Sequence, residues 1–134
     1  MTNEPARGNG EMILLVEDQK EVGDIAEDML DALGYNVLRA ADATEALSII
    51  EERGDIDLLL TDIVMPGSMN GTDLAMKARE ESGLRAVLVT GYADKAIPSD
   101  QFERFDVLLK PFRMDELGQR IRAALDAEKR AGAD

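Results

Sequence analysis

Five polar side chains stand directly after short apolar runs of the sequence. In chain order they are Glu17, Asp18, Asp62, Thr90 and Lys110. Carboxylates are oxygen ligands of the kind that Mg²⁺ binds, and an aspartate can also act as a nucleophile toward phosphorus. An ammonium group and a metal ion can neutralise charge on phosphoryl oxygens, to which a hydroxyl can donate a hydrogen bond. These residue types therefore indicate phosphoryl chemistry at a metal-binding carboxylate cluster.

The three acids indicate a functional site only when they are considered together. A single aspartate after a strand is most often a turn residue or a helix cap. Three carboxylates gathered within a few ångströms repel one another, which raises their proton affinity unless a cation lies between them. A structural cap also needs no lysine and threonine on neighbouring strands. The combination favours a site over separate caps.

Two absences restrict the chemistry further. The chain contains no cysteine and no histidine. Disulfides, thiolate nucleophiles, imidazole metal sites and Ser-His-Asp catalysis are therefore excluded. What remains are carboxylates, hydroxyls, amines and a hard metal ion.

Length and charge define the class of protein. The 134 residues suit one domain, and 45% hydrophobic with 32% charged residues is an ordinary globular balance. With 28 acidic against 15 basic residues the net charge is −13, which disfavours binding to nucleic acid or to anionic membranes. No apolar stretch approaches the roughly 18 residues of a membrane span, and the start lacks a signal-peptide core. We expect a cytoplasmic protein.

The elements that position the five side chains alternate along the chain. The apolar runs predict five strands, at residues 12–16, 35–40, 58–60, 86–90 and 107–110. The second of these alternates in polarity, as an edge strand does. Residues 1–10 are expected to form a flexible arm, residues 11–127 the folded domain and residues 128–134 a tail.

Amphipathic helices are predicted between the strands. The first ends at Gly34; the second begins at a capping box formed by Asp42 and Glu45 and ends at Gly54. A third runs over residues 72–82, and the last carries its apolar face from Leu117 onward. Residues 92–105 contain Pro98, so only a short or irregular helix is expected there. Gly67 and Gly71 are interpreted as turn residues.

This alternation predicts an α/β fold, a (βα)5 doubly wound parallel sheet of the flavodoxin-like type. In the strand order 2-1-3-4-5 the order reverses between the first and third strands, and ligands bind at the carboxyl edge beside that point. Those two strands deliver the three acids. Thr90 and Lys110 reach the same edge from the next two strands.

The segments LLVEDQ, LLLTDIVMPGSMNG, VLVTGYAD and LLKPF, in this sequence order, resemble the response-regulator receiver domains of bacterial two-component signalling. The resemblance covers about residues 11–127, and the strand order 2-1-3-4-5 is the one that resemblance to this CheY-like family implies. By resemblance, Asp62 accepts the phosphoryl group. Asp18 binds Mg²⁺ directly, Glu17 assists, and the backbone carbonyl of Val64 completes the protein ligands.

The resemblance also assigns the switch. Thr90 is implied as the switch hydroxyl and Lys110 as the phosphate-contacting amine, followed by a cis bond to Pro111. The family often has Tyr or Phe where this chain has Val107, so the usual coupling between the threonine and an aromatic ring is altered. Tyr92 is our candidate substitute. The loop MPGSMNG is one residue longer than the common family pattern.

The resemblance implies a signalling switch rather than an enzyme with a separate substrate. The donor would be a histidine kinase or a histidine phosphotransfer protein, and the output would be contact with a downstream protein or onward phosphotransfer, since the chain ends soon after its last helix. One alternative is a receiver-shaped binding module that is not phosphorylated. Another is a phosphatase of the haloacid dehalogenase type, which requires a second aspartate where Val64 stands.

Overall fold

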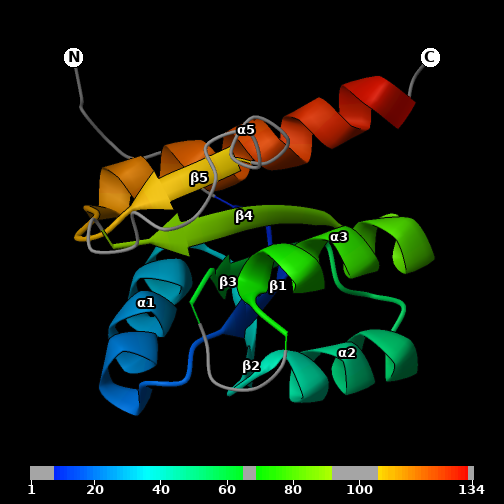
Figure 1. The fold of residues 1–134 in the computed structure, drawn as a ribbon. Helices are drawn as coiled ribbons and strands as arrows, with labels where there is room; N and C mark the ends of the chain where they lie inside the picture. The colour runs from blue at the N-terminus through cyan, green and yellow to red at the C-terminus, as the bar shows by residue number, and fades with distance from the viewer. Residues whose placement is uncertain (1–7, 65–68, 92–105, 133–134) are drawn as a thin grey trace.

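A five-stranded parallel sheet lies between two layers of helices (Figure 1). The computed structural model describes residues 8–64, 69–91 and 106–132. Its strands are β1 (Met12–Val16), β2 (Asn36–Ala40), β3 (Leu58–Asp62), β4 (Arg85–Thr90) and β5 (Asp106–Leu109), and its helices are α1 (Lys20–Leu33), α2 (Ala43–Glu52), α3 (Gly71–Ser82) and α5 (Met114–Gly132).

The strand order is β2-β1-β3-β4-β5, and every neighbouring pair is parallel. The predicted fold class and strand order are confirmed, with β2 at an edge as its alternating pattern indicated. The helix expected within residues 92–105 lies outside the described residues.

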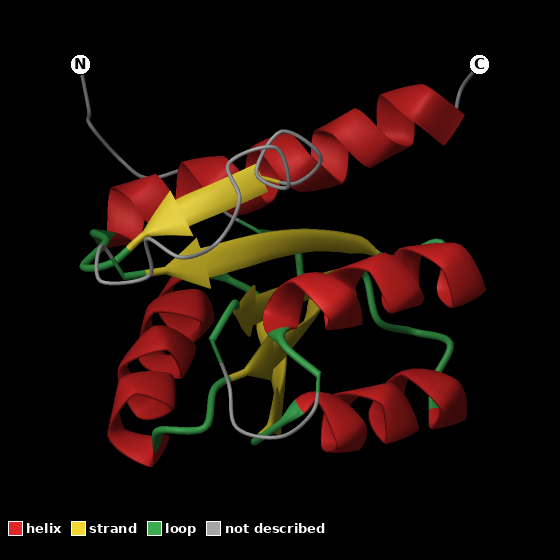
Figure 2. Cartoon of the chain, in the orientation of Figure 1, coloured by secondary structure: helices red, strands yellow, loops and turns green. Residues whose placement is uncertain are grey.

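Successive residues of each central strand enter opposite hydrophobic cores, because side chains alternate across a sheet. In β1, Leu14 and Val16 pack with α2 and α3, whereas Ile13 and Leu15 pack with α1 and α5. The yellow sheet in Figure 2 is accordingly covered by red helices on both faces. Burial on both faces explains why these strands are continuous apolar runs.

The helix ends follow the predicted signals, with one exception. Gly34 and Gly83 adopt the left-handed conformation after α1 and α3, and the Asp42 side chain accepts a hydrogen bond from the backbone of Glu45. The prediction that α2 ends at Gly54 was wrong: the helix ends at Glu52, and an extended Arg53 follows it. No left-handed residue is required there, so Gly54 is not needed as a cap.

The two ends of the described chain are partly ordered by the domain. The backbone N–H groups of Gly8 and Gly10 donate to the carbonyls of Leu33 and Gly34, at 2.7 and 2.8 Å. These residues belong to the range expected as an arm. At the other end α5 continues to Gly132, through most of the range expected as a tail.

Candidate functional site

The carboxyl ends of the five parallel strands lie at one edge of the sheet, and backbone hydrogen bonds between neighbouring strand ends fix their relative positions. The N–H of Ile63, after β3, donates to the Val89 carbonyl of β4 at 3.0 Å. The N–H of Lys110, after β5, donates to the Thr90 carbonyl at 2.8 Å. On the other side, the Glu17 N–H after β1 donates to the Ala40 carbonyl of β2 at 3.0 Å.

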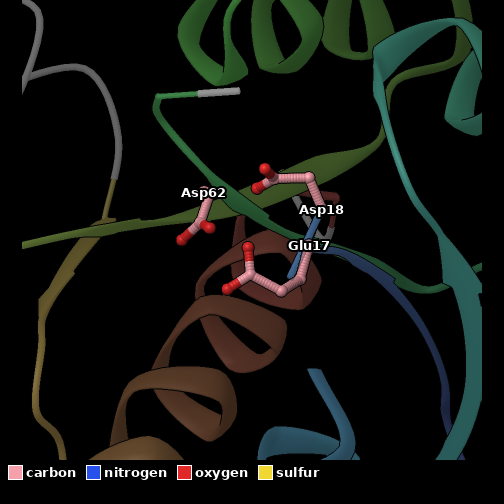
Figure 3. Close-up of side chains that lie close together, drawn as sticks. All are labelled: Glu17, Asp18 and Asp62. Carbon is pink, nitrogen blue, oxygen red and sulfur yellow. The ribbon is translucent and has the colours of Figure 1, made fainter. Parts of the chain in front are cut away.

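This edge brings the three predicted acids together. Glu17, Asp18 and Asp62 each offer a carboxylate oxygen within 4.8 Å of the others. Figure 3 shows the three carboxyl groups around one small space, two of them on the connection after β1 and one at the end of β3. Glu17 and Asp62 are buried, whereas Asp18 is exposed. The cluster therefore has a buried floor and a side open to solvent.

Lys110 supplies the positive charge of the site. Its Nζ lies 2.8 Å from Asp62 Oδ1 and 3.3 Å from Glu17 Oε1. The lysine side chain is 31% exposed, so the ammonium group spans the buried acids and the solvent. Lys110 directly follows β5, at the edge of the sheet where the sequence predicted it.

Burial and mutual repulsion set the protonation of the two buried acids. Burial, with the hydrogen bond to Glu17, raises the pKa of Asp62 to about 8, against the opposing effect of Lys110. For Glu17, burial favours a higher pKa, but the hydrogen bond with Asp62 and the charge of Lys110 have a larger combined effect. The net result is that the pKa of Glu17 is lowered. The two buried acids therefore favour holding one proton between them, with the pKa of Asp62 raised and that of Glu17 lowered. The neutral acid avoids placing two adjacent buried charges side by side.

Thr90 and Val64 lie at the same edge. Val89 is the register partner of Asp62, so Thr90 comes one residue beyond that pairing, and its side chain is buried with Oγ1 donating to the Gly91 carbonyl at 3.2 Å. Val64 stands two residues after Asp62, with its side chain exposed. The structure therefore brings all five polar side chains of the sequence prediction to one edge.

Of the three remaining predicted residues, the structure describes Pro111 and Val107 but not Tyr92. The Lys110–Pro111 peptide bond is cis, as the resemblance implied. Val107 is half-buried and packs against the core on the α2 and α3 side of the sheet. Tyr92 lies outside the described residues, so its suggested coupling to Thr90 stays a prediction.

Sequence reasoning missed the role of Gly71. This residue begins α3 and its N–H donates to the Ile63 carbonyl at 2.7 Å. A Cβ atom at Gly71 would stand 1.9 Å from the carbonyl oxygen of Asp62, where only a glycine fits. Interpreting Gly71 as a turn residue was therefore incomplete. The absence of a side chain at Gly71 lets α3 contact the backbone of Asp62 closely. The available signal in the sequence was a glycine nine residues after Asp62, directly before the predicted helix.

The donor set fits a hard divalent cation. All three acids present oxygen atoms, and Glu17 Oε2 is buried with no hydrogen-bond partner in the described part of the chain. A buried carboxylate oxygen without a partner is costly, and a cation would satisfy it. Mg²⁺ prefers such sites, where one or two carboxylates and several waters surround it.

The family model for the response regulator receiver domain matches residues 13–122. This range contains every residue of the site and, apart from Ala124 and Leu125, both hydrophobic cores. The chain belongs to the response regulator receiver domain family. The family resemblance predicted from the four sequence segments is thereby confirmed.

Known receiver domains agree in sequence and in fold. The uncharacterized transcriptional regulatory protein YrkP of Bacillus subtilis (strain 168) is 34% identical over 118 residues, which are 84% of this chain and 48% of that protein. The receiver domain from the hybrid histidine kinase CckA is 36% identical with a TM-score of 0.69, covering 85% of this chain and 98% of that one. A CheY-like receiver domain protein from Methanospirillum hungatei JF-1 is 32% identical with a TM-score of 0.78, over 91% and 98% of the two chains.

This receiver domain spans about half the length of the first curated relatives that it matches, 48% and 52%. Across the described residues, none of its helices is both long enough and apolar enough to cross a membrane.

Proposed function

We propose that this receiver domain accepts a phosphoryl group on Asp62 and acts as a signalling switch. One observation carries the proposal: the Asp62 carboxyl group lies 2.8 Å from the Lys110 ammonium and beside two further acids, at the open edge of the sheet. A nucleophile, a counter-charge and a cation-binding group are therefore adjacent. The family of the chain supports the same assignment.

The transfer is a displacement at phosphorus. An Asp62 carboxylate oxygen forms a bond to the phosphorus atom while the bond from phosphorus to the nitrogen of a donor imidazole breaks, and the imidazole leaves. Asp62 must first release to solvent the proton that burial favours, because a neutral carboxyl group is a poor nucleophile, and the departing imidazole takes up a proton from solvent. The Lys110 ammonium remains beside the product to offset the charge of the acyl phosphate.

Glu17, Asp18, Asp62 and the backbone carbonyl of Val64 would hold the Mg²⁺ ion. When bound, Mg²⁺ supplies positive charge that stabilises the phosphoryl oxygens in the transition state. The residues of this chain orient the reacting carboxylate and exclude water from its buried side.

We propose further that Thr90 and Lys110 turn toward the new phosphoryl oxygens and shift a pre-existing conformational equilibrium of the expected fourth helix and of β5. The donor would be the phosphohistidine of a histidine kinase or a phosphotransfer protein. The likeness to a hybrid-kinase receiver domain supports this class of donor. The output would be a contact with a downstream protein or onward transfer of the phosphoryl group.

Two other functions lack a supporting feature. A haloacid dehalogenase phosphatase needs a second aspartate two residues after the nucleophile, and Val64 stands there. We therefore expect no turnover of phosphate esters as separate substrates. A binding module that is never phosphorylated has no need of the acid cluster with its paired lysine.

Incubation with acetyl phosphate and Mg²⁺, followed by intact-protein mass spectrometry, tests the proposal. We expect one phosphoryl adduct in the wild type and in Asp28→Asn, an exposed α1 control, and none in Asp62→Asn. Stoichiometric labelling of Asp62→Asn would refute the assignment of the acceptor. A wild type that binds Mg²⁺ without any labelling would favour the binding module.

A further inference from the structure

We infer that Arg39 and Gly23 together position Asp18, by bracing the start of α1 against β2. The inference rests on the proposed function, because Asp18 matters here as a metal ligand. We call the contact between Arg39 and the first two turns of α1 the Arg39 brace.

The Arg39 guanidinium crosses from β2 to α1 and contacts it at three points. Nη1 lies 3.0 Å from Asp24 Oδ1 and 2.9 Å from Glu27 Oε1. Nη2 donates a longer hydrogen bond, 3.4 Å, to the backbone carbonyl of Lys20, the first residue of α1. The arginine side chain is 28% exposed, whereas the side chains of Asp24 and Glu27 are 47% and 36% exposed.

Gly23 provides the space for this contact. A Cβ atom at Gly23 would stand 2.2 Å from Arg39 Nη2, so the guanidinium occupies the place of a side chain on the helix. Glycine is a poor helix former, and one inside a helix often marks a close approach. Gly23 and Arg39 are complementary in shape, and neither is explained by the hydrophobic pattern of its element.

The brace bears on Asp18 because the connection between β1 and α1 is very short. Only Glu17, Asp18 and Gln19 join the two elements, and the Gln19 side chain makes no capping hydrogen bond to the helix. Asp18 is exposed. Its position therefore follows from the position of the first turn of α1, which Arg39 ties to the sheet.

Calorimetric titration with MgCl₂ tests this inference on wild type, Arg39→Ala, Gly23→Ala, the double variant and Arg53→Ala. Arg53→Ala is the matched control: it removes the same charge from an exposed ion pair with Asp55, away from the site. Removing a positive charge should by itself strengthen Mg²⁺ binding. We instead expect a dissociation constant about fivefold higher in Arg39→Ala, below the ~10–100-fold typical of direct partners of metal ligands. Arg53→Ala should bind as tightly as wild type or slightly more tightly.

Gly23→Ala separates positioning from stability. Alanine favours the helix, so the thermal midpoint should not fall, yet the methyl group displaces the guanidinium and Mg²⁺ binding should weaken to a similar extent. In the double variant the two effects should not add, because both remove one contact. The amide NMR signals of Asp18 and Gln19 in metal-free protein should shift in Arg39→Ala and stay in place in Arg53→Ala.

Wild-type affinity in Arg39→Ala and Gly23→Ala would overturn the brace and leave the proposed function intact. A wild type that takes up no Mg²⁺ would instead refute the metal site of the proposed function, and the brace with it. Additive losses in the double variant would likewise contradict a single shared contact.

Discussion

At the scale of single residues, Asp62 carries a conflict between stability and function. Its pKa of about 8 means that the folded chain holds a proton which the unfolded chain releases near pH 4. Stability of the metal-free domain therefore falls as pH rises from about 4 to about 8, where the buried group finally ionises. The ionised carboxylate is the form that the proposed phosphoryl transfer requires, and it is also the form that burial destabilises.

Replacing this carboxyl group should stabilise the domain. In Asp62→Asn the amide can still donate to Glu17 and accept from Lys110, but it has no charge to desolvate. We expect the free energy of unfolding in urea, without Mg²⁺ at pH 8, to rise by about 1–3 kcal/mol, since each pKa unit corresponds to about 1.4 kcal/mol. Asp28→Asn, at an exposed position, should change it by less than about 0.5 kcal/mol. An Asp62→Asn protein less stable than wild type would contradict the pKa argument.

The same proton should compete with the metal. Since Mg²⁺ binds the ionised carboxylate, the proton on Asp62 must leave as the ion binds, and affinity should rise with pH up to about 8 and level off above it. Below pH 8, each rise of one pH unit should lower the dissociation constant for Mg²⁺ by up to about tenfold. Titration calorimetry at pH 7 in buffers of different ionisation enthalpy should report close to one proton released per ion. A proton count near zero would show that Asp62 is already ionised.

At the scale of elements, the site depends on how closely α3 approaches the end of β3. The helix starts at a reciprocal capping box, in which the Asn70 side chain accepts from the Asp73 N–H and the Asp73 carboxylate accepts from the Asn70 N–H. Its first residue, Gly71, then rests on the Asp62 backbone. The backbone of Asp62 is thus in close contact with a helix start nine residues later in the chain.

Gly71→Ala should disturb this packing severely. The atom nearest to the new methyl group is a backbone carbonyl oxygen, which cannot rotate away. We expect a loss of about 2–4 kcal/mol in the free energy of unfolding, measured in urea, because a helix and a strand must separate. Gly54→Ala is the control, since no atom lies within 4 Å of its Cβ position, and it should be neutral within about 0.5 kcal/mol. Equal stability of the two variants would disprove the close contact.

At the scale of the whole molecule, charge is the dominant global feature. A net charge of −13 on 134 residues makes the compact state repel itself. Several ion pairs offset this locally, but those with both partners exposed each contribute little. Added salt should therefore stabilise the fold more by screening the excess negative charge than it destabilises the fold by weakening the ion pairs.

Added NaCl should raise the thermal midpoint in the presence of a chelator. Because the Debye length falls to about 10 Å at 0.1 M salt, long-range repulsion weakens first. We expect an increase of about 2–5 °C between low and physiological ionic strength, followed by circular dichroism. In wild type, MgCl₂ should add a further increase over NaCl of equal ionic strength, and this should be lost in Asp18→Asn. A midpoint that falls with NaCl would show that the ion pairs outweigh the net repulsion.

Much of the fold and the chemical groups of the site could be predicted from local pattern. Continuous apolar runs such as Leu58–Leu60 predict strands buried on both faces, and parallel strands must bring Asp62, Thr90 and Lys110 to one edge. Helix caps such as Gly34 were also predictable, because their signals lie within one turn of the chain. Where the signal was weaker, as at Gly54, the predicted helix end was wrong by two residues.

What the sequence by itself determined was therefore the order of elements and the kinds of side chain at their ends, which depend on neighbours along the chain. Only the tertiary structure decided that the pKa of Asp62 is raised and that of Glu17 lowered, that Gly71 contacts the Asp62 backbone, and that Arg39 fills the space at Gly23. Burial and close approach are set by atoms from segments far apart in sequence. No local pattern contains their distances.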